Sequence, residues 1–433
     1  MITYNFTTNI CRIGMYKTPR GTQDILPAEQ AYWRFIDQQA SILCQRYGYQ
    51  RIDTPVFEES GLFYRSIGAG TDIVDKEMYT FEDRSGTKMT LRPEGTAPVC
   101  RAYIEHGMHN LPQPVRLYYF APIFRYERPQ AGRYRQHYQF GVEALGDADP
   151  SLDAEVIDLA WQFLASLGMK MLVLQVNNIG CKLCRGDYLP RLKQYYSMHS
   201  EALCPNCQVR LERSPLRLLD CKNPSCQQIA QNAPKIIDHL CPQCDSHFKQ
   251  VKGYLAYLEI PLEINPYLVR GLDYYSSTVF EIQPEGGGAQ STIGGGGRYD
   301  NLIEELAGRA TPAVGFAAGI ERIILNMQKQ GIEPPPIPQP KVYVAYLGEE
   351  GSREAVKLVA RLRRAGLGAI KAPGGRSLKA QLKQANSLGA AQVVIIGEEE
   401  AKRGSIILRD MEKGDQKEIP QQKAVTLLRD FYV

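Results

Sequence analysis

The chain has 433 residues, of which 44% are hydrophobic and 23% are charged, and its net charge at pH 7 is +4. This composition supplies enough apolar side chains for about three domains with buried cores, so the chain is not mainly disordered. Its longest apolar runs fall far short of the ~18 residues that a membrane-spanning helix needs, and its N-terminal residues lack a signal-peptide pattern. We therefore expect a cytoplasmic protein that does not enter a membrane.

Helices and strands follow each other along the first three quarters of the chain. Residues 1–14 show no periodicity, and we expect them to form a disordered tail. Apolar residues recur at helical spacing over two segments that are each followed by glycine, which predicts helices at residues 29–47 and 152–167. Stretches rich in aromatic and β-branched residues predict strands at residues 116–125, 138–144, 278–282 and 313–318. Strands bracketed by helices predict an α+β domain built on an antiparallel sheet.

A second domain follows a linker. Five prolines within residues 331–340 predict a stiff polyproline spacer. Beyond it, apolar runs predict strands at residues 342–347, 369–371, 393–396 and 405–408. Helical spacing predicts helices at residues 355–365, 378–388 and 424–431. This alternation predicts an α/β domain over residues 341–433, with a mixed, largely parallel sheet covered by helices.

Eight of the eleven cysteines lie in four pairs within one short segment. Cys181 and Cys184 precede Cys204 and Cys207 at the spacing of a zinc ribbon, in which two thiolate pairs share one tetrahedral zinc. A looser second set comprises Cys221, Cys226, Cys241 and Cys244. In a reducing cytosol such pairs favour one or two structural zinc ions over disulfides, although a fold without metal stays open.

The charge is distributed unevenly. Residues 341–433 carry 17 basic and 11 acidic side chains, residues 181–252 carry 11 and 6, and the remaining chain is acidic. Two basic segments attached to an acidic body suit a protein that binds a polyanion such as nucleic acid. On charge alone, ordinary variation in surface charge is a slightly better explanation of the same distribution.

Three arginines stand in apolar surroundings, where an unpaired guanidinium is costly: Arg125, Arg270 and Arg322. No glycine-rich nucleotide-binding motif is present, so a bound nucleotide would depend on such side chains. A guanidinium matches phosphate oxygens bidentately, which makes each arginine a candidate anion clamp. The alternative is a salt bridge to the neighbouring acid in each case, namely Glu127, Asp273 and Glu321.

Several further side chains suit a polar ligand. The turn around residues 91–97 presents Glu94 and Thr96, a carboxylate and a hydroxyl that could bind an ammonium group. Alternation along the strand at residues 138–144 places Gln139 and Glu143 on one face, where the carboxylate needs a cationic or N–H-bearing partner. The glycines at residues 294–297 either let backbone approach a ligand closely or form a flexible hairpin tip.

Together these segments resemble the class II aminoacyl-tRNA synthetases, and within them the histidyl-tRNA synthetase family. The resemblance runs from Pro19-Arg20-Gly21 to the C-terminus. It includes the family's motif 2 at residues 124–143 and motif 3 at residues 315–322. Two histidine-specific stretches also match, at residues 268–275 and 296–300.

The resemblance implies a catalytic domain at residues 15–330 with an insertion at about 181–252, and an anticodon-binding domain at residues 341–433. It implies that ATP with Mg²⁺ activates histidine to histidyl-adenylate, and that histidine then passes to tRNA(His). A homodimer is expected. The alternative is a non-catalytic, synthetase-like regulatory subunit of histidine biosynthesis, which usually lacks the anticodon domain and catalytic arginines; this chain retains both.

The family's site residues carry over onto matching positions. Arg125 and Arg270 would be catalytic and would bind the α-phosphate of ATP, and Arg322 would bind the γ-phosphate. The residues expected to bind histidine are Glu94, Gly95, Thr96, Gln139, Glu143, Tyr274 and Tyr275. Of these, Glu143 and Tyr275 would hydrogen-bond the imidazole, while Tyr299 would close the pocket.

Overall fold

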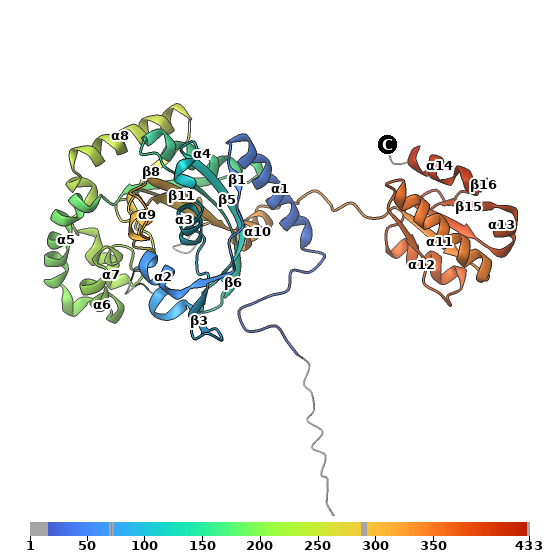
Figure 1. Ribbon diagram of the computed structural model, residues 1–433, viewed down its shortest axis with the longest axis horizontal. Coiled ribbons are helices and arrows are strands. Elements are labelled where there is room, and N and C mark those ends of the chain that lie inside the picture. Colours follow the sequence, from blue (N-terminus) through green and yellow to red (C-terminus); the bar gives the residue numbers. More distant parts are fainter. Residues whose placement is uncertain (1–15, 69–70, 72, 287–291, 431–433) are drawn as a thin grey trace, which may run out of the picture. The chain divides into compact units, whose positions relative to one another are not determined.

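An eight-stranded sheet organises the first part of the chain (Figure 1). Its strand order is β1-β5-β6-β11-β10-β9-β7-β8, and every pairing from β5 to β7 is antiparallel. The strands are β1 (Gln50–Arg51), β5 (Val115–Phe124), β6 (Gln136–Leu145), β7 (Leu172–Asn178), β8 (Leu262–Ile264), β9 (Ser276–Pro284), β10 (Gly294–Arg298) and β11 (Ala313–Gly319). The predicted α+β domain with an antiparallel sheet is confirmed.

The computed structural model describes residues 16–68, 71, 73–286 and 292–430. The chain divides into two units, one ending at Pro335 and one beginning at Pro336. The expected disordered tail at residues 1–14 lies outside the described residues. None of the helices described is both long and apolar enough to cross a bilayer.

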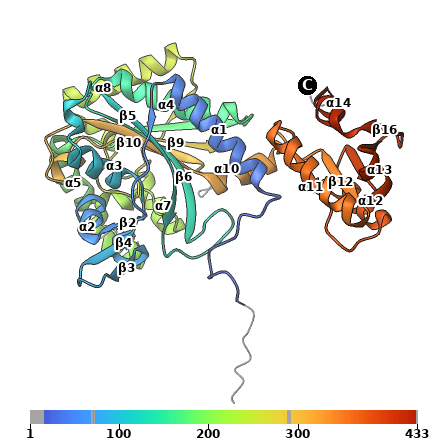
Figure 2. The same ribbon diagram turned by 45° about the vertical axis from the view of Figure 1, so that its right-hand side comes forward.

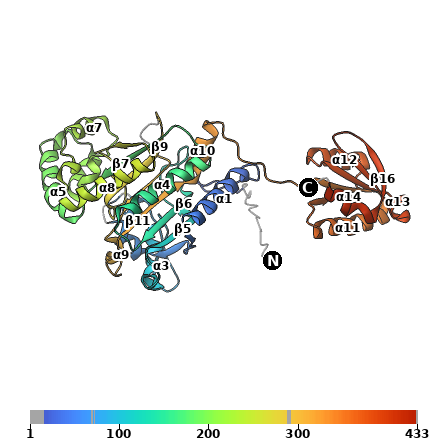
Figure 3. The ribbon, with the colours of Figure 1, turned by 90° about the horizontal axis from the view of Figure 1, so that it is seen from above.

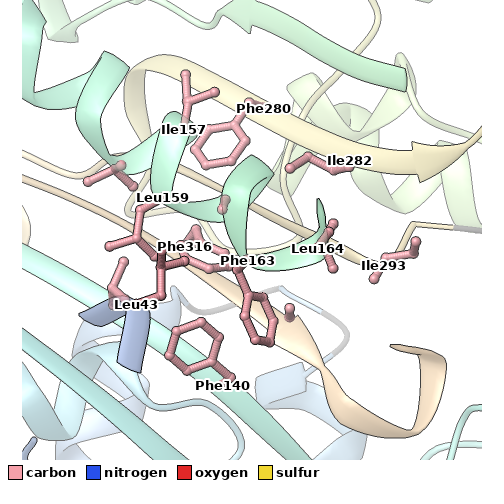
Figure 4. Packing of buried hydrophobic residues seen from close by; sticks show 14 of the residues in the cluster. Leu43, Phe140, Ile157, Leu159, Phe163, Leu164, Phe280, Ile282, Ile293 and Phe316 are labelled. Carbon is pink, nitrogen blue, oxygen red and sulfur yellow. The ribbon is translucent and has the colours of Figure 1, made fainter. Parts of the chain in front are cut away.

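Four helices cover one face of the large sheet (Figures 2 and 3). They are α1 (Gln30–Arg46), α4 (Pro150–Ser166), α8 (Pro242–Tyr257) and α10 (Ile320–Lys329). In Figure 4, Phe163 of α4 lies against Phe140 of β6, and their ring centroids are 4.5 Å apart. Phe316 of β11 packs on Phe140 from the other side at 5.6 Å. The apolar residues whose spacing predicted α1 and α4 therefore form the face that each helix buries.

A small sheet and two short helices shape the opposite face. The small sheet has the order β2-β4-β3, from β2 (Phe57–Glu59), β4 (Lys88–Leu91) and β3 (Tyr79–Glu82). Helices α2 (Ser60–Ile67) and α3 (Thr96–Glu105) pack beside it. Because β4 ends at Leu91 and α3 begins at Thr96, Glu94 lies in the tight connection between them.

The glycines at residues 294–297 form strand β10 in the middle of the large sheet, and all of them are buried. The structure therefore excludes a flexible hairpin tip at these positions; the expected turn overlaps residues 287–291, which lie outside the described residues. A Cβ on Gly296 would lie 2.0 Å from the Gly315 carbonyl oxygen, and one on Gly295 would lie 2.8 Å from Arg270 Nη1. The strand needs glycine because neighbouring backbone and Arg270 occupy the space of a side chain.

We expect Gly296→Ala to destabilise the protein by about 3 kcal/mol, since the obstructing atoms belong to backbone that cannot rotate away. Thermal unfolding followed by circular dichroism should show a midpoint several degrees lower. Gly253→Ala in α8 is the matched control, because a Cβ there meets nothing within 4 Å. That change should be neutral or stabilising, as alanine favours helix. Equal midpoints for Gly296→Ala and the original chain would contradict this packing argument.

The segment between β7 and β8 forms four helices, shown in green in Figure 1. Three of them, α5 (Lys182–Ser197), α6 (Pro205–Arg213) and α7 (Pro224–Gln231), pack in a cluster beside the sheet. The fourth, α8, buries Phe248, Val251 and Leu255 in the main core. We call α5, α6, α7 and their connections, residues 181–240, the inserted lobe.

The second unit has a five-stranded sheet with the order β13-β12-β14-β15-β16. Its strands are β12 (Val342–Tyr346), β13 (Ala369–Lys371), β14 (Gln392–Ile396), β15 (Ser405–Asp410) and β16 (Gln416–Pro420), and its helices are α11 (Gly348–Arg364), α12 (Leu378–Ser387), α13 (Glu398–Arg403) and α14 (Ala424–Asp430). The predicted α/β class is confirmed. The expected mixed sheet is confirmed, but it is not largely parallel: β12 pairs with β13 and β14 in parallel, whereas β14–β15 and β15–β16 pair antiparallel. Sequence reasoning missed β16 and α13, which bury almost no apolar side chains.

Candidate active site

A cavity of about 290 Å³ opens on the face of the large sheet that carries α3. Its walls come from β5, β6, β9, β10, β11, the start of α10 and the loop before β9. Most of the residues that the sequence indicated lie on these walls: Glu94, Gly95, Thr96, Arg125, Gln139, Arg270, Tyr274, Tyr275 and Arg322. Residues almost 230 positions apart in the chain therefore share one site.

Glu94 is fixed at the N-terminus of α3. Its Oε2 accepts a hydrogen bond from the Thr96 amide at 2.6 Å, and its Oε1 accepts one from the Ala97 amide at 2.9 Å. Burial raises the pKa of Glu94, while these two amides and the nearby Arg125 oppose the rise. A cationic ligand group would stabilise the ionised form of Glu94 in the same way as these amides and Arg125. This part of the cavity wall is therefore suited to bind an ammonium group.

Glu143 lies behind the cavity and is not among the lining residues. It is 1% exposed, and it accepts hydrogen bonds from the Thr96 hydroxyl at 2.7 Å and from the Tyr299 hydroxyl. Burial raises the pKa of Glu143 to about 8, so its carboxyl is mostly protonated at pH 7 in the empty protein. A Cβ on Gly315 would lie 2.0 Å from Glu143 Oε2, so glycine makes room for this buried acid.

The three arginines do not form the salt bridges that their sequence neighbours offered. Glu127 accepts from Arg133, Glu321 accepts from the Tyr138 amide at 3.0 Å, and Asp273 accepts from the Ser214 hydroxyl at 3.3 Å. The arginines use other partners. Arg125 donates to the Pro93 carbonyl at 2.7 Å, Arg322 to the Thr292 carbonyl at 2.7 Å, and Arg270 pairs with Glu281.

Electrostatics favour an anion in this cavity. Burial lowers the pKa of Arg125 and of Arg322, which shows that the site desolvates both cations. Arg270 Nε is buried and has no hydrogen-bond partner among the described residues. Burial, with Arg125 close by, lowers the pKa of His137 to about 3, so His137 is neutral at pH 7. A phosphate would satisfy donors that the protein leaves without an anion.

Sequence reasoning missed several residues on these walls, among them Tyr119, His137 and Glu281. A Cβ on Gly95 or on Gly141 would lie 2.3 Å from the Tyr119 ring, so this tyrosine explains both glycines. Alternation along β5 was the available signal for Tyr119, because it places Tyr119 on the face opposite Tyr118. No sequence pattern near Glu281 indicated that it lines the site, because its partner Arg270 lies in the loop that precedes β9.

The eight paired cysteines lie away from this cavity and form two groups of four. One group is Cys181, Cys184, Cys241 and Cys244; the other is Cys204, Cys207, Cys221 and Cys226. The zinc-ribbon pairing predicted from spacing is therefore wrong. Helix α5 begins right after Cys181 and runs for 16 residues, which is about 24 Å, so it carries the next cysteine pair away from the first.

Comparison with known proteins places both parts of the chain in known families. The histidyl-tRNA synthetase family model matches residues 21–183 and 223–323, and an anticodon-binding domain model matches residues 341–431. Histidine–tRNA ligase of Dehalococcoides mccartyi is 59% identical over 411 residues, which cover 95% of this chain and 98% of the relative. That of Desulforamulus reducens is 52% identical over the same shares.

A solved structure agrees over nearly the whole chain. The crystal structure of apo Staphylococcus aureus histidyl-tRNA synthetase superposes with a TM-score of 0.80 at 40% sequence identity, covering 95% of this chain and 99% of that one. A Bacillus halodurans protein described as a phosphoribosyltransferase regulatory subunit or histidyl-tRNA synthetase shares the fold at 21% identity and a TM-score of 0.63. The family models and the near full-length relatives together show that this chain belongs to the histidyl-tRNA synthetase family.

Proposed function

We propose that this histidine–tRNA ligase carries out both steps of its reaction at the cavity on the large sheet. Histidine attacks the α-phosphate of ATP to give histidyl-adenylate and pyrophosphate, and the histidyl group then passes to the terminal adenosine of tRNA(His). The observation that carries this proposal is the convergence of Arg125, Arg270 and Arg322 on one cavity with Glu94 and Gln139. Anion clamps and an ammonium site thus face the same space.

The arginines divide the triphosphate among them. Arg125, at the end of β5, holds the α-phosphate and the histidine carboxylate, and Arg322, in the first turn of α10, holds the γ-phosphate. Arg270 stabilises the charge that develops on the α-phosphate in the transition state. ATP enters as its Mg²⁺ complex, in which the ion neutralises phosphate charge.

Histidine is selected from two sides. Glu94, Thr96 and Gln139 bind its ammonium, with Gly95 leaving space, while Tyr274 and Tyr275 line the wall beside the imidazole. Glu143 reaches an imidazole N–H once Tyr299 gives up its hydrogen bond to Oε2. Side chains without ring nitrogens are rejected because Glu143 and Tyr275 would then remain buried without partners.

The second unit supplies a further tRNA contact. It matches an anticodon-binding model, and its helices α11 and α12 expose Arg361, Arg364, Lys379 and Lys383. We assign these cations to the phosphate backbone of tRNA(His). Such contacts hold the tRNA without reading its bases.

The active form is a homodimer in the cytoplasm. Phe57 and Phe81 on the small sheet are 49% and 44% exposed and contact each other edge-to-face, a surface that a second subunit would cover. None of the described cysteines forms a disulfide, as is typical of a reducing compartment. The regulatory-subunit alternative is not favoured, because the chain keeps all three arginines and the second unit.

Pyrophosphate exchange into ATP, measured with each of the twenty amino acids in the absence of tRNA, tests this function. We expect exchange with histidine alone. No exchange with any amino acid would favour the regulatory alternative. Exchange with a different amino acid would mean that the roles of Glu143 and Tyr275 are misassigned.

A further inference from the structure

The sulfur positions in the two cysteine groups have the geometry of a tetrahedral metal site. Within each group all four Sγ atoms lie within 4.8 Å of one another. The Cys181–Cys184 distance is 3.6 Å, and the Cys181–Cys241 and Cys204–Cys221 distances are both 3.9 Å. A disulfide needs about 2.05 Å, whereas four thiolates around zinc, each about 2.3 Å from the metal, stand about 3.8 Å apart. The observed distances match zinc and exclude disulfides.

The surrounding backbone is arranged to stabilise thiolates. Cys181, Cys204 and Cys241 are each the residue that precedes a helix, and the second cysteine of each pair lies in that helix's first turn. A helix N-terminus carries partial positive charge, which favours a thiolate over a thiol. Two amides also donate to sulfur across the pairs: Cys241 N to Cys184 Sγ at 3.1 Å and Cys204 N to Cys226 Sγ at 3.3 Å. Such N–H···S bonds orient the sulfurs of metal sites.

Metal ions would add to the stability of the inserted lobe, whose helices otherwise depend on packing against the sheet domain. Its helices α6 and α7 have nine and eight residues, and helices shorter than about 12 residues are marginal without tertiary support. Small structures that cannot bury a large core commonly use a structural metal instead. The histidyl-tRNA synthetase family model leaves residues 184–222, which hold most of the lobe, unmatched.

We propose that the chain binds two structural zinc ions in nested sites. The outer site, formed by Cys181, Cys184, Cys241 and Cys244, joins the start of the inserted lobe to the helix that follows it. The inner site, formed by Cys204, Cys207, Cys221 and Cys226, holds the lobe's tip together. Both sites have four protein ligands and no open position, so the zinc ions serve structure rather than chemistry.

The outer site adjoins the histidine-binding loop. The Asn178 side chain, at the end of β7, donates to the Cys244 carbonyl at 3.4 Å, and Cys244 Sγ lies 3.9 Å from the Ser277 hydroxyl of β9. Arg185, next to Cys184, donates to the carbonyls of Ile179, at 3.0 Å, and of Tyr275. The outer zinc therefore positions Tyr275. The importance of this position for histidine binding rests on the proposed function, whereas the proposal that zinc binds does not.

Metal analysis of the full-length protein, purified without chelators, tests the proposal. We expect two zinc ions per chain, and one or fewer would overturn the two-site assignment. The variant Cys181→Ser/Cys241→Ser should retain one zinc, because both changes fall in the outer site. Cys181→Ser/Cys204→Ser should retain none, because it breaks both sites. The opposite result for these two variants would establish the sequential pairing and overturn the nested one.

Two measurements guard against misfolding of the variants. Cys44→Ala, which removes a buried thiol outside both groups, should keep two zinc ions. Titrating metal-free wild-type protein with Co²⁺ should produce the visible and charge-transfer bands of a tetrahedral tetrathiolate, rising up to two equivalents. Bands that are absent, or that saturate at one equivalent, would overturn the proposal independently of any variant.

The positioning role has its own test. Cys241→Ser should raise the KM for histidine in pyrophosphate exchange by about tenfold, since a displaced loop misplaces the substrate. Cys221→Ser in the inner site should leave that KM within about twofold. Equal KM values for the two variants would overturn the positioning role of the outer site, while the zinc counts would still decide the sites.

Discussion

Replacing Arg270 with alanine is expected to slow histidyl-adenylate formation by about 10²- to 10³-fold while histidine still binds. A donor aimed at charge that develops in the transition state contributes about 3–4 kcal/mol, and it contributes little to binding of the ground state. Arg270 lines the cavity, and its Nε has no hydrogen-bond partner among the described residues. The close approach of Nη1 to Gly295 shows that β10 is built to admit this side chain.

Pyrophosphate exchange and histidine binding by calorimetry separate the two effects of this change. A loss confined to exchange supports the transition-state role, and unchanged exchange kinetics would refute it. Removing Arg270 also leaves the Glu281 carboxylate without its ion pair, so that only the Thr292 hydroxyl, at 2.7 Å, still donates to it, and this loss can itself disturb the site. The double variant Arg270→Ala/Glu281→Gln removes that charge as well. We expect no recovery of exchange in the double variant; full recovery would assign the loss to Glu281.

Glu143→Gln is expected to raise the KM for histidine by about 10- to 100-fold and yet to make the empty protein more stable. When histidine binds, Glu143 gives up its proton and accepts from the imidazole N–H as a carboxylate; a hydrogen bond to such a charged group contributes about 1.5–3 kcal/mol, which the amide loses. Stability responds in the opposite direction because the pKa of Glu143 is raised from 4.5 to about 8 by burial. Above pH 4.5 the unfolded chain releases this proton while the folded protein retains it, so unfolding becomes easier as pH rises.

The pH profile of unfolding gives this prediction its signature. As the pH rises from 4.5 to about 8, the raised pKa of Glu143 progressively lowers the free energy of unfolding of the wild-type protein. Above about pH 8 it lowers it no further. The free energy of unfolding of Glu143→Gln should therefore equal that of the wild type near pH 4.5. The difference should grow to about 3–5 kcal/mol as the pH rises and stay constant above about pH 8. Urea unfolding at five pH values measures it. Glu349→Gln on the exposed surface of α11 is the control and should show no such trend. An advantage independent of pH would contradict the assignment of the titration to Glu143.

Much of the fold could be predicted because the relevant signals are local. The periodicity of 3.6 in α1 and α4, and the β-branched and aromatic runs of β5 and β11, describe faces that each element buries. The same reasoning failed for β16 and α13. Those elements bury almost no apolar side chains, so they leave no periodic pattern to detect.

The glycines at residues 294–297 could not be assigned to a turn or to a strand from the sequence alone. Such a run of glycines is typical of a turn and also of backbone that lies close to a ligand or to another strand. In the structure they form a buried central strand, because the Gly315 carbonyl and Arg270 leave no room for side chains there. No property of the four residues themselves distinguishes these two cases.

The sequence alone was enough to identify the family and most of the residues that line the cavity, since those depend on residue type and spacing. The tertiary structure decided which of these residues are partners. It placed Arg270 against Glu281 rather than Asp273, set Glu143 behind the cavity wall, and grouped the cysteines as nested sets. The reason is physical: a contact depends on where rigid elements such as α5 end in space, and a helix separates neighbours in sequence by its full length.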